Sequence, residues 1–289
     1  MNDLSIHRLL DAAERVLAGG PHPDKARRDA EELLLLALGR DVPGANRAWL
    51  LAHHDEPALC TASALATLVD RRIAGEPLQY IAGETEFYRL PFFVDRSVLI
   101  PRPETEHVVE RVLELGPAFA KPRIADVGTG SGAIAIAVAH ERPEAVVAAT
   151  EISGAALRLA RRNAERHGLA KRVRFFEGDL LAPVAGEQVD IVVSNPPYVA
   201  ERDRDSLPVE VRCFEPAEAL FAGEDGLASY RRLIPAAQNA LAPGGYVVLE
   251  IGFGQEEAVR ALLADAGFTE IEFRADLQRI PRVASARRS

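Results

Sequence analysis

The sequence predicts an α/β fold in which a doubly wound, mostly parallel sheet follows a bundle of helices. Three observations lead to this prediction. The first quarter of the chain places apolar residues at helical spacing, with glycines between the runs. From residue 104 onward, short apolar runs alternate with helical patterns, and this alternation produces parallel strands joined by right-handed crossovers. A glycine-rich turn links the first of these strands to its helix.

Residues 1–76 are predicted to form a helical bundle that contains no motif for chemistry. Short polar or glycine-containing joints separate its helical runs, so neighbouring helices are expected to pack against each other. The adjacent His53 and His54 would point in different directions on a helix and have no third ligand nearby, so no metal site is predicted. The expected helices cover Ser5–Leu17, Pro23–Leu38, Asn46–Ala52 and Thr61–Ala74.

Residues 77–103 are predicted to form a strand pair that links the bundle to the rest of the chain. Aromatic and β-branched residues gather here between glycines and prolines, which is typical of strands and turns. Their side chains are expected to form a packing seam rather than a ligand surface. These β-type residues are Tyr80, Ile81, Phe87, Tyr88, Phe92, Phe93 and Val94.

The remaining part, residues 104–289, is predicted to contain the parallel sheet. Ligands of such sheets bind at the carboxyl ends of the strands, beside the point where the strand order reverses. Residues that directly follow a strand are therefore the candidates for binding and catalysis. Strands are expected at Arg123–Val127, Val146–Glu151, Val173–Glu177, Val189–Ser194 and Gly245–Ile251, and helices at Ala133–His140, Gly154–His167, Ala228–Leu241 and Glu256–Ala266.

Charge and composition argue against several classes of protein. The chain has 34 Lys+Arg against 43 Asp+Glu, a net charge of −9. An acidic surface is a poor partner for nucleic acid, whose affinity comes largely from phosphate neutralisation. The chain shows neither a signal peptide nor a run of about 18 apolar residues, so we expect a cytoplasmic protein without membrane contact. Cys60 and Cys213 lack the spacing of a zinc site or a disulfide framework and are interpreted as inert thiols.

The segment IADVGTGSGAIAIAVA, residues 124–139, reads as a strand, a glycine turn and a helix. The glycines permit a tight turn and let a ligand approach backbone N–H groups at the helix start. With Ala133 in third place, the spacing also fits the dinucleotide pattern, so the loop alone leaves two classes of cofactor open. Glu151 ends the next strand about 20 residues later, where an acid accepts hydrogen bonds from ribose hydroxyls in either class. The candidate loop residues are Asp126, Gly128, Thr129, Gly130, Ser131 and Gly132.

The most informative stretch is VDIVVSNPPYV, residues 189–199. A buried strand runs into a loop whose two prolines lack N–H groups and keep the residues before them extended. This stiff loop offers the Asn195 side-chain oxygen and the Pro196 carbonyl in fixed directions, and two acceptors suit an NH2 group with two hydrogens. Tyr198 adds a flat face and a hydroxyl beside them. We interpret Asn195, Pro196 and Tyr198 as catalytic, and these three with Pro197 as the substrate site.

NPPY after a fourth strand resembles the signature of class I S-adenosylmethionine-dependent methyltransferases, Rossmann-like enzymes that alkylate planar nitrogen in amides or base amino groups. A redox enzyme would not need this motif, and no catalytic His or Lys is suitably placed after the fourth strand, so S-adenosylmethionine is favoured over NAD. In such enzymes an acidic residue after the third strand often faces the adenine amino group. The resemblance gives this role to Asp179, with Leu180 packed on the ring and Asn195 beside the cofactor.

Along nearly its whole length the chain resembles the HemK/PrmC family, glutamine methyltransferases that act on class 1 peptide chain release factors. One departure is Glu151, where the family more often has Asp, and the longer carboxylate should still reach a ribose. The segments that carry the resemblance are EPLQYIAGETEFYRLPFFVDRSVLIPRPETE, IADVGTGSGAIA, VSNPPYV, VRCFEPAEAL, GGYVVLEIG and ADLQRIPRV.

The resemblance implies methyl transfer from S-adenosylmethionine, with S-adenosylhomocysteine as product, to the side-chain amide nitrogen of the glutamine in a Gly-Gly-Gln loop of the release factor. It also implies that the helical bundle grips the rest of that partner. Three alternatives stay open. They are methylation of a glutamine on a large-subunit ribosomal protein, methylation of a nucleic-acid amino group, which the net charge of −9 argues against, and a cofactor sensor without catalysis, which has no need of NPPY.

Overall fold

The structure is a computed structural model that describes most of the chain. Cys60 and Thr61 lie outside the described residues, and so do the interpretation of Cys60 as an inert thiol and the helix start predicted at Thr61. Within the described part, every helix is too short or too polar to cross a membrane. The described residues are 5–39, 42, 44–58 and 62–289.

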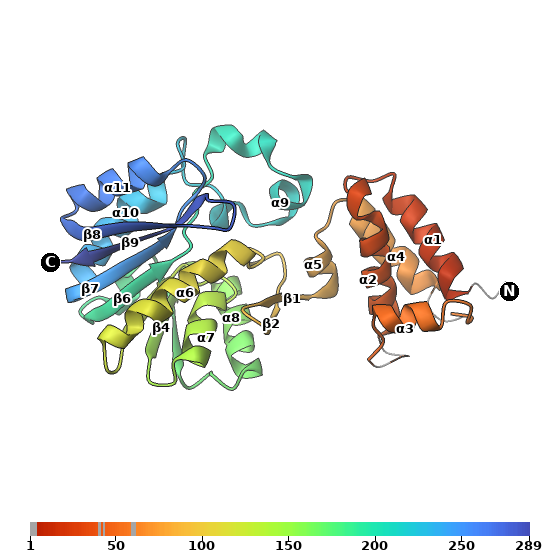
Figure 1. Ribbon diagram of the computed structural model, residues 1–289, viewed down its shortest axis with the longest axis horizontal. Coiled ribbons are helices and arrows are strands. Elements are labelled where there is room, and N and C mark those ends of the chain that lie inside the picture. The colour runs from red at the N-terminus through yellow and green to blue at the C-terminus, as the bar shows by residue number, and fades with distance from the viewer. Residues whose placement is uncertain (1–4, 40–41, 43, 59–61) are drawn as a thin grey trace. The chain divides into compact units, whose positions relative to one another are not determined.

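The chain divides into two compact units (Figure 1). The first contains the residues up to Gly83 together with Pro208–Phe214, and the second contains Glu84–Leu207 and Glu215–Ser289. The sequence predicted a boundary after residue 76 and a separate linker. In the structure the hairpin belongs to the second unit, and a segment from late in the sequence belongs to the first.

The first unit is a helical bundle, as predicted. In its first helix the apolar residues recur every three or four positions, so one face carries Ile6, Leu9, Leu10, Ala13 and Leu17, all buried. This face belongs to a single apolar core with buried leucines of the second helix. The helices of this unit are α1 (Ile6–Leu17), α2 (Ala26–Leu38), α3 (Arg47–Ala52), α4 (Ala62–Ile73), α5 (Leu78–Ala82) and α9 (Val209–Phe214).

Tyr80 and Ile81 were predicted in a strand, and this prediction is wrong because both lie in the short helix α5. Pro77 precedes the helix with a φ of −55°, and Gly83 follows it in the left-handed conformation with a φ of +78°. Tyr80 and Ile81 are both buried, and Ile81 packs in the bundle core. Tertiary burial therefore overrode the β propensity of these two residues.

A buried ion-pair network holds α9 in the first unit. Arg72 is 3% exposed, and its Nε donates to Asp29 Oδ2 at 2.6 Å. Its Nη1 lies 3.0 Å from Glu210 Oε2 on α9, and His22 Nε2 lies 3.1 Å from the same oxygen. Because a buried charge is costly without a partner, this network specifies where α9 lies in the bundle.

Replacing Arg72 with alanine is expected to destabilise the first unit by about 3–5 kcal/mol, because Asp29 would stay buried without its counter-ion. Arg231→Ala is the matched control, since Arg231 pairs with Asp225 where both side chains are solvent-exposed. Urea unfolding followed by circular dichroism measures both variants. Equal midpoints for the two variants would contradict the assigned role of Arg72.

The second unit is built on a seven-stranded sheet with the order β5-β4-β3-β6-β7-β9-β8. The strands from β3 to β7 are parallel, and β8 and β9 form an antiparallel hairpin beside β7. The predicted hairpin before the sheet is confirmed as β1 (Glu84–Phe87) and β2 (Leu90–Phe93). The first four sheet strands have the predicted bounds, whereas β7 begins earlier than predicted. The strands are β3 (Arg123–Val127), β4 (Val146–Glu151), β5 (Val173–Glu177), β6 (Val189–Ser194), β7 (Leu241–Glu250), β8 (Phe268–Ala275) and β9 (Pro281–Arg288).

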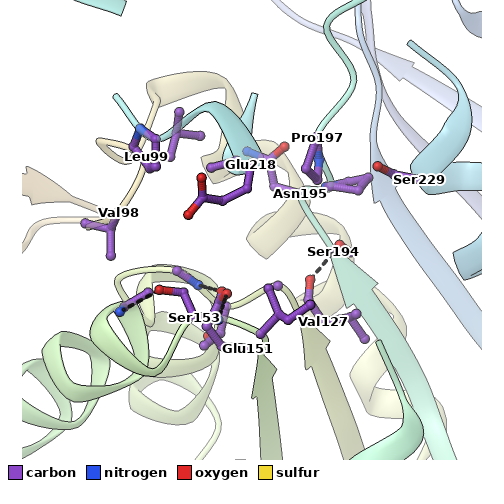
Figure 2. Close-up of a pocket in the computed structure, with 18 of the residues that line it drawn as sticks. Val98, Leu99, Val127, Glu151, Ser153, Ser194, Asn195, Pro197, Glu218 and Ser229 are labelled. Carbon is purple, nitrogen blue, oxygen red and sulfur yellow. Dashed lines mark hydrogen bonds between the residues drawn. The ribbon is translucent and has the colours of Figure 1, made fainter. Parts of the chain in front are cut away.

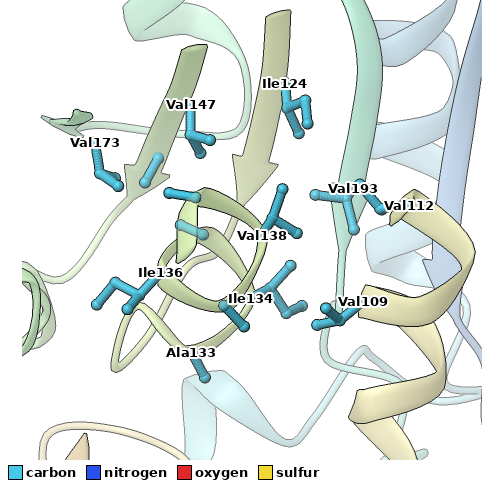
Figure 3. Close-up of a cluster of buried hydrophobic side chains, with 14 of the residues drawn as sticks. Val109, Val112, Ile124, Ala133, Ile134, Ile136, Val138, Val147, Val173 and Val193 are labelled. Carbon is cyan, nitrogen blue, oxygen red and sulfur yellow. The ribbon is translucent and has the colours of Figure 1, made fainter. Parts of the chain in front are cut away.

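Helices cover both faces of this sheet, which confirms the predicted fold class (Figure 1). Because side chains alternate along a strand, Ile124 joins the apolar cluster of α6 and α7, whereas Ala125 joins that of α10 and α11. In Figure 3, Ile134 and Val138 of α7 lie among side chains from several strands and from α6. The helices are α6 (Glu106–Leu115), α7 (Ala133–Glu141), α8 (Gly154–Arg166), α10 (Ala228–Ala240) and α11 (Glu256–Asp265).

The strand order reverses between β3 and β6. From β3 the chain adds β4 and β5 toward one edge, then returns to place β6 on the other side of β3. Ser194 Oγ donates to Val127 O at 2.6 Å and so joins the carboxyl ends of these two strands. A doubly wound sheet binds its ligands in the crevice at such a reversal.

Candidate active site

A cavity of about 460 Å³ opens at this crevice (Figure 2). Its volume lies in the ordinary range for a small-molecule site. Three of the predicted site residues do not line it, namely Asp126, Gly132 and Tyr198. The predicted residues that do line it are Gly128, Thr129, Gly130, Ser131, Glu151, Asp179, Leu180, Asn195, Pro196 and Pro197.

The glycine turn between β3 and α7 forms one wall of the cavity. Gly128, Gly130 and Gly132 have φ values of +71°, +55° and +84°, a conformation that glycine adopts without strain. A Cβ atom on Gly132 would lie 2.9 Å from Ile136 Cδ1, so this glycine also permits close packing of the turn on α7. The turn therefore needs glycine for backbone shape at all three positions, and at the third for packing as well.

Asp126 lies beneath the turn and is 1% exposed. Its Oδ2 accepts hydrogen bonds from Thr129 Oγ1 at 2.6 Å and from the backbone N–H of Ala135 at 3.1 Å. Burial raises the pKa of this carboxyl to about 7, although both hydrogen bonds act in the opposite direction. Asp126 thus joins the turn to the first residues of α7 instead of facing the cavity.

Glu151 lies at the carboxyl end of β4 and faces the cavity (Figure 2). Its Oε2 accepts from the backbone N–H of Gly130 at 2.9 Å, and its Oε1 accepts from that of Ser153 at 2.9 Å. The carboxylate is 9% exposed, and two backbone donors from opposite sides fix its direction. A carboxylate oxygen can accept more than one hydrogen bond, so capacity remains for a ligand hydroxyl.

Asp179 and Leu180 line the cavity beyond the end of β5. Asp179 forms an ion pair with Arg232 of α10, which lines the same cavity. Leu180 has a φ of +47° and packs at the edge of the α10 cluster. No sequence motif indicated Arg232, which lies 53 residues after its partner and inside a helix.

The NPPY loop begins where the fully buried strand β6 ends. Asn195 Nδ2 donates to Thr105 Oγ1 at 3.1 Å, and Pro196 is buried. Within the described part of the chain, no donor is hydrogen-bonded to Asn195 Oδ1 or to the Pro196 carbonyl oxygen. Both acceptors are therefore available at the wall of the cavity.

Tyr198 is directed away from the cavity. Its hydroxyl donates to Glu250 Oε1 at 3.2 Å, and its ring packs against the α10 cluster. Burial, together with the charge of Glu250, raises the pKa of Tyr198 well above its ordinary value. Gln255 Nε2 donates to the Tyr198 carbonyl at 3.0 Å, so both the side chain and the backbone of Tyr198 are held.

Sequence reasoning missed three acidic or hydroxyl side chains at this site. Thr105 Oγ1 donates to Glu250 Oε2 at 2.6 Å, and Glu250 is 2% exposed at the end of β7. Glu218 lines the cavity, and in Figure 2 its carboxylate points into it. The available signal was position, because each lies in a segment that carried the family resemblance: IPRPETE, VVLEIG and FEPAEAL.

Arg102, a residue at a proline-rich junction, pairs with Glu215 of the FEPAEAL segment. Glu215 is 6% exposed, and its Oε2 also accepts from the backbone N–H of Ile100 at 3.4 Å. These contacts fix the segment that presents Glu218 to the cavity.

Within the part of the chain that the structure describes, no cluster of three or more metal-ligating side chains occurs.

Two solved structures share the fold of this chain. A methyltransferase from Pyrococcus furiosus matches with a TM-score of 0.51 and 18% identity, over 69% of this chain and 89% of that chain. The catalytic domain of hMettl16, solved with an RNA hairpin, matches with a TM-score of 0.56 and 16% identity, over 78% of this chain and 81% of that chain. At these identities the likeness concerns the fold alone.

Family models and curated relatives are more specific. Residues 108–223 match the methyltransferase small domain, and residues 8–83 match the PrmC N-terminal domain. The release factor glutamine methyltransferase of Geobacter sulfurreducens is 43% identical over 284 residues, which are 98% of this chain and 96% of that protein. The enzyme of the same name from Bradyrhizobium diazoefficiens is 43% identical over 100% of this chain and 98% of its own. The resemblance drawn from the sequence is thereby confirmed, and the chain belongs to the release factor glutamine methyltransferase family.

Proposed function

We propose that this protein transfers a methyl group from S-adenosylmethionine to the side-chain amide nitrogen of the glutamine in the Gly-Gly-Gln loop of class 1 peptide chain release factors. The observation that carries the proposal is the pair of available acceptors, Asn195 Oδ1 and the Pro196 carbonyl, at the wall of the cavity. A primary carboxamide nitrogen has two hydrogens, and this pair suits both.

The residues of the cavity fit S-adenosylmethionine better than a dinucleotide. Glu151 and Glu218 line it and provide negative charge, which favours a cationic sulfonium. Among the described residues that line the cavity, the one cation is Arg232, and it is already paired with Asp179. The negative charge of a pyrophosphate would be repelled by the Glu151 and Glu218 carboxylates. Bound in this cavity, S-adenosylmethionine would supply an electrophilic methyl group.

Within this proposal, Glu151 binds the ribose hydroxyls, and the glycine turn receives the amino-acid end of the cofactor against its backbone. Asp179 would face the adenine amino group and Leu180 would pack on the ring, as the family resemblance implies. Asp126, Thr129 and Gly132 support the turn from below. The product, S-adenosylhomocysteine, carries no sulfonium charge and loses that electrostatic attraction to the carboxylates.

The chemical difficulty is that an amide nitrogen is a weak nucleophile. Its lone pair is delocalised into the carbonyl, and the barrier to rotation, about 18–20 kcal/mol, measures that delocalisation. Hydrogen bonds to Asn195 and Pro196, about 0.5–1.5 kcal/mol each, are too weak to uncouple the amide. Positioning can contribute up to about 7–11 kcal/mol. The two acceptors therefore act chiefly by aligning the nitrogen with the methyl group, and they also stabilise the positive charge that develops on it.

After methyl transfer the nitrogen is strongly acidic and loses a proton to water. Asn195 is not a base at neutral pH, so its role is that of acceptor. Pro197 keeps the loop stiff, and Tyr198 holds its far end through Glu250. The helical unit, residues 1–83 with α9, is the part we assign to gripping the release factor.

The alternatives receive less support. Three curated relatives that each cover at least 90% of this chain are named for release factors. A nucleic-acid substrate is disfavoured by the net charge of −9. A sensor would have no use for two oriented amide acceptors.

The direct test incubates the protein with isotope-labelled S-adenosylmethionine and purified release factor, followed by peptide mass spectrometry. We expect a single methyl group on the Gly-Gly-Gln glutamine. A release factor with that glutamine replaced by alanine is the control and should acquire no label. Label that appears only on ribosomal protein, RNA or DNA would overturn the substrate assignment.

A further inference from the structure

A chain of hydrogen bonds connects the side chain of Asn195 to a buried carboxylate. Asn195 Nδ2 donates to Thr105 Oγ1 at 3.1 Å, and Thr105 Oγ1 donates to Glu250 Oε2 at 2.6 Å. Thr105 is 4% exposed and Glu250 is 2% exposed, so the contact between these two side chains is well shielded from water. The three residues come from three separate segments: Asn195 directly follows β6, Thr105 directly precedes α6, and Glu250 ends β7.

The donors and acceptors of these side chains allow only one direction for the two hydrogen bonds, from Asn195 to Thr105 and from Thr105 to Glu250. A threonine hydroxyl has one proton, and an ionised carboxylate can only accept. The Thr105 proton is therefore committed to Glu250, and Thr105 Oγ1 can only accept from Asn195. Consequently the NH2 group of Asn195 must face Thr105, and its oxygen must point the other way. The shape of an asparagine side chain leaves its two orientations equivalent, so this network decides between them.

We infer that Thr105 and Glu250 are positioning residues that hold the Asn195 carboxamide with its oxygen toward the cavity. This inference rests on the proposed function, in which that oxygen receives a hydrogen of the substrate amide. Without the two residues, Asn195 can rotate its NH2 group into the same place. Two NH2 groups then face each other, and neither can accept.

The Thr105 hydroxyl serves this network and not the helix that follows it. Thr105 occupies the N-cap position of α6, where a hydroxyl ordinarily accepts from a backbone N–H of the helix. Here its side chain makes no such capping bond. The hydroxyl is directed instead to Glu250 and Asn195, so its removal costs the helix no cap and chiefly affects the network.

Glu250 also holds the other end of the NPPY motif. Its Oε1 accepts from the Tyr198 hydroxyl at 3.2 Å, while its Oε2 accepts from Thr105. The backbone oxygen of Glu250 accepts from the hydroxyl of the fully buried Tyr230 at 2.9 Å. One carboxylate thus fixes both the first and the last residue of the motif, the first through Thr105.

Protonation of Glu250 would allow the hydrogen bonds among Glu250, Thr105 and Asn195 to run in either direction. A protonated carboxyl can donate to Thr105, whose hydroxyl is then free to donate to Asn195 and to favour the reversed amide. Burial raises the pKa of Glu250 to about 7. Glu104 raises it further, while Thr105, Tyr198 and Arg282 lower it. The carboxylate form, which supports activity, is populated above this pKa, so kcat should rise with pH through about 7.

Thr105→Val tests the inference, because valine keeps the shape and removes the hydroxyl. We expect kcat for release factor methylation to fall by about 10- to 100-fold, less than the 10²–10³ expected for loss of one catalytic hydrogen-bonding group, because the amide still samples the productive orientation. The dissociation constant of S-adenosylmethionine should stay within about twofold, since Thr105 bonds to Asn195 and Glu250 and not to the glycine turn. Thr105→Ser restores the hydroxyl and should recover kcat, which separates this role from a packing role.

A double-mutant cycle with Asn195→Ala supplies a readout that a purely structural role would not move. In that background Thr105 has no carboxamide to orient, so Thr105→Val should cause no further loss of kcat. An equal loss in both backgrounds, or unchanged kcat in Thr105→Val, would overturn the inference. Methylation of the release factor by the wild type tests the proposed function separately, because the inference concerns only the ratio of kcat between variants.

Two further measurements do not depend on the comparison of those rates. In the free protein, the side-chain NH2 signal of Asn195 in a nitrogen-15 spectrum should be protected from hydrogen exchange, and Thr105→Val should abolish the protection. Glu250→Gln should flatten the acid limb of the kcat profile. Asp126, with its own pKa of about 7, lies under the cofactor turn and should affect the cofactor dissociation constant instead. An unprotected Asn195 signal in the wild type, or an intact acid limb in Glu250→Gln, would refute the inference.

Discussion

Replacing Asn195 with alanine is expected to lower kcat for glutamine methylation by about 10²–10³-fold, the usual loss when one pre-organised hydrogen-bonding group is removed from an active site. The side-chain oxygen is one of only two acceptors offered to the substrate amide, and the Pro196 carbonyl alone leaves the amide free to rotate. Rapid-quench kinetics with release factor at saturating S-adenosylmethionine measures the effect.

The dissociation constant of the cofactor should change far less, by no more than about tenfold, because Glu151 and the glycine turn remain intact. Asn239→Ala is the matched control, since Asn239 is exposed on α10 and does not line the cavity. That variant should retain wild-type kcat. If Asn195→Ala kept wild-type kcat, or lost activity only through weaker cofactor binding, the alignment role of the NPPY loop would be wrong.

Replacing Glu151 with alanine is expected to weaken binding of S-adenosylmethionine by about 100-fold. The variant loses the hydrogen bonds of a charged acceptor to the ribose, about 1.5–3 kcal/mol for such a bond. It also leaves the backbone N–H groups of Gly130 and Ser153 without their partner, so the glycine turn loses part of its support. Isothermal titration calorimetry with the cofactor measures the change.

Glu151→Asp is the matched control for this prediction. Aspartate keeps the charge at a slightly shorter reach, so binding should stay within about tenfold of the wild type. An equal loss of cofactor affinity in the alanine and aspartate variants would show that a carboxylate at the shorter reach cannot replace Glu151. An unchanged dissociation constant in Glu151→Ala would remove Glu151 from the cofactor site.

Much of the fold could be predicted because buried parallel strands and a glycine turn have local signals. The runs at Val189–Ser194 and Val146–Glu151 are apolar throughout, since helices cover both faces of the sheet, and their bounds are confirmed. The positive φ values at Gly128 and Gly130 follow from the same local reasoning. The same local reasoning wrongly predicted a strand at Tyr80 and Ile81, because their burial in and beside the bundle core decided their conformation.

The candidate site was predicted where its chemistry lies within a motif, and missed where it depends on contacts between distant segments. Asn195 and Pro196 were identified from two prolines after a strand. Thr105 and Glu250 are separated by 145 residues, and only the packing of α6 against β7 brings them together. A sequence pattern contains no distance, so it could not select this pair from the many buried acids and hydroxyls.

Local sequence was enough to predict the doubly wound sheet, the glycine turn, the acid at the end of β4 and the stiff NPPY loop, because each has a signal in residues that are neighbours in the chain. The folded structure was needed to learn which way the Asn195 amide points, which partner Asp179 takes, and that α9 belongs to the helical unit. Hydrogen-bond direction and buried charge pairing are set by atoms that meet only after the chain has folded.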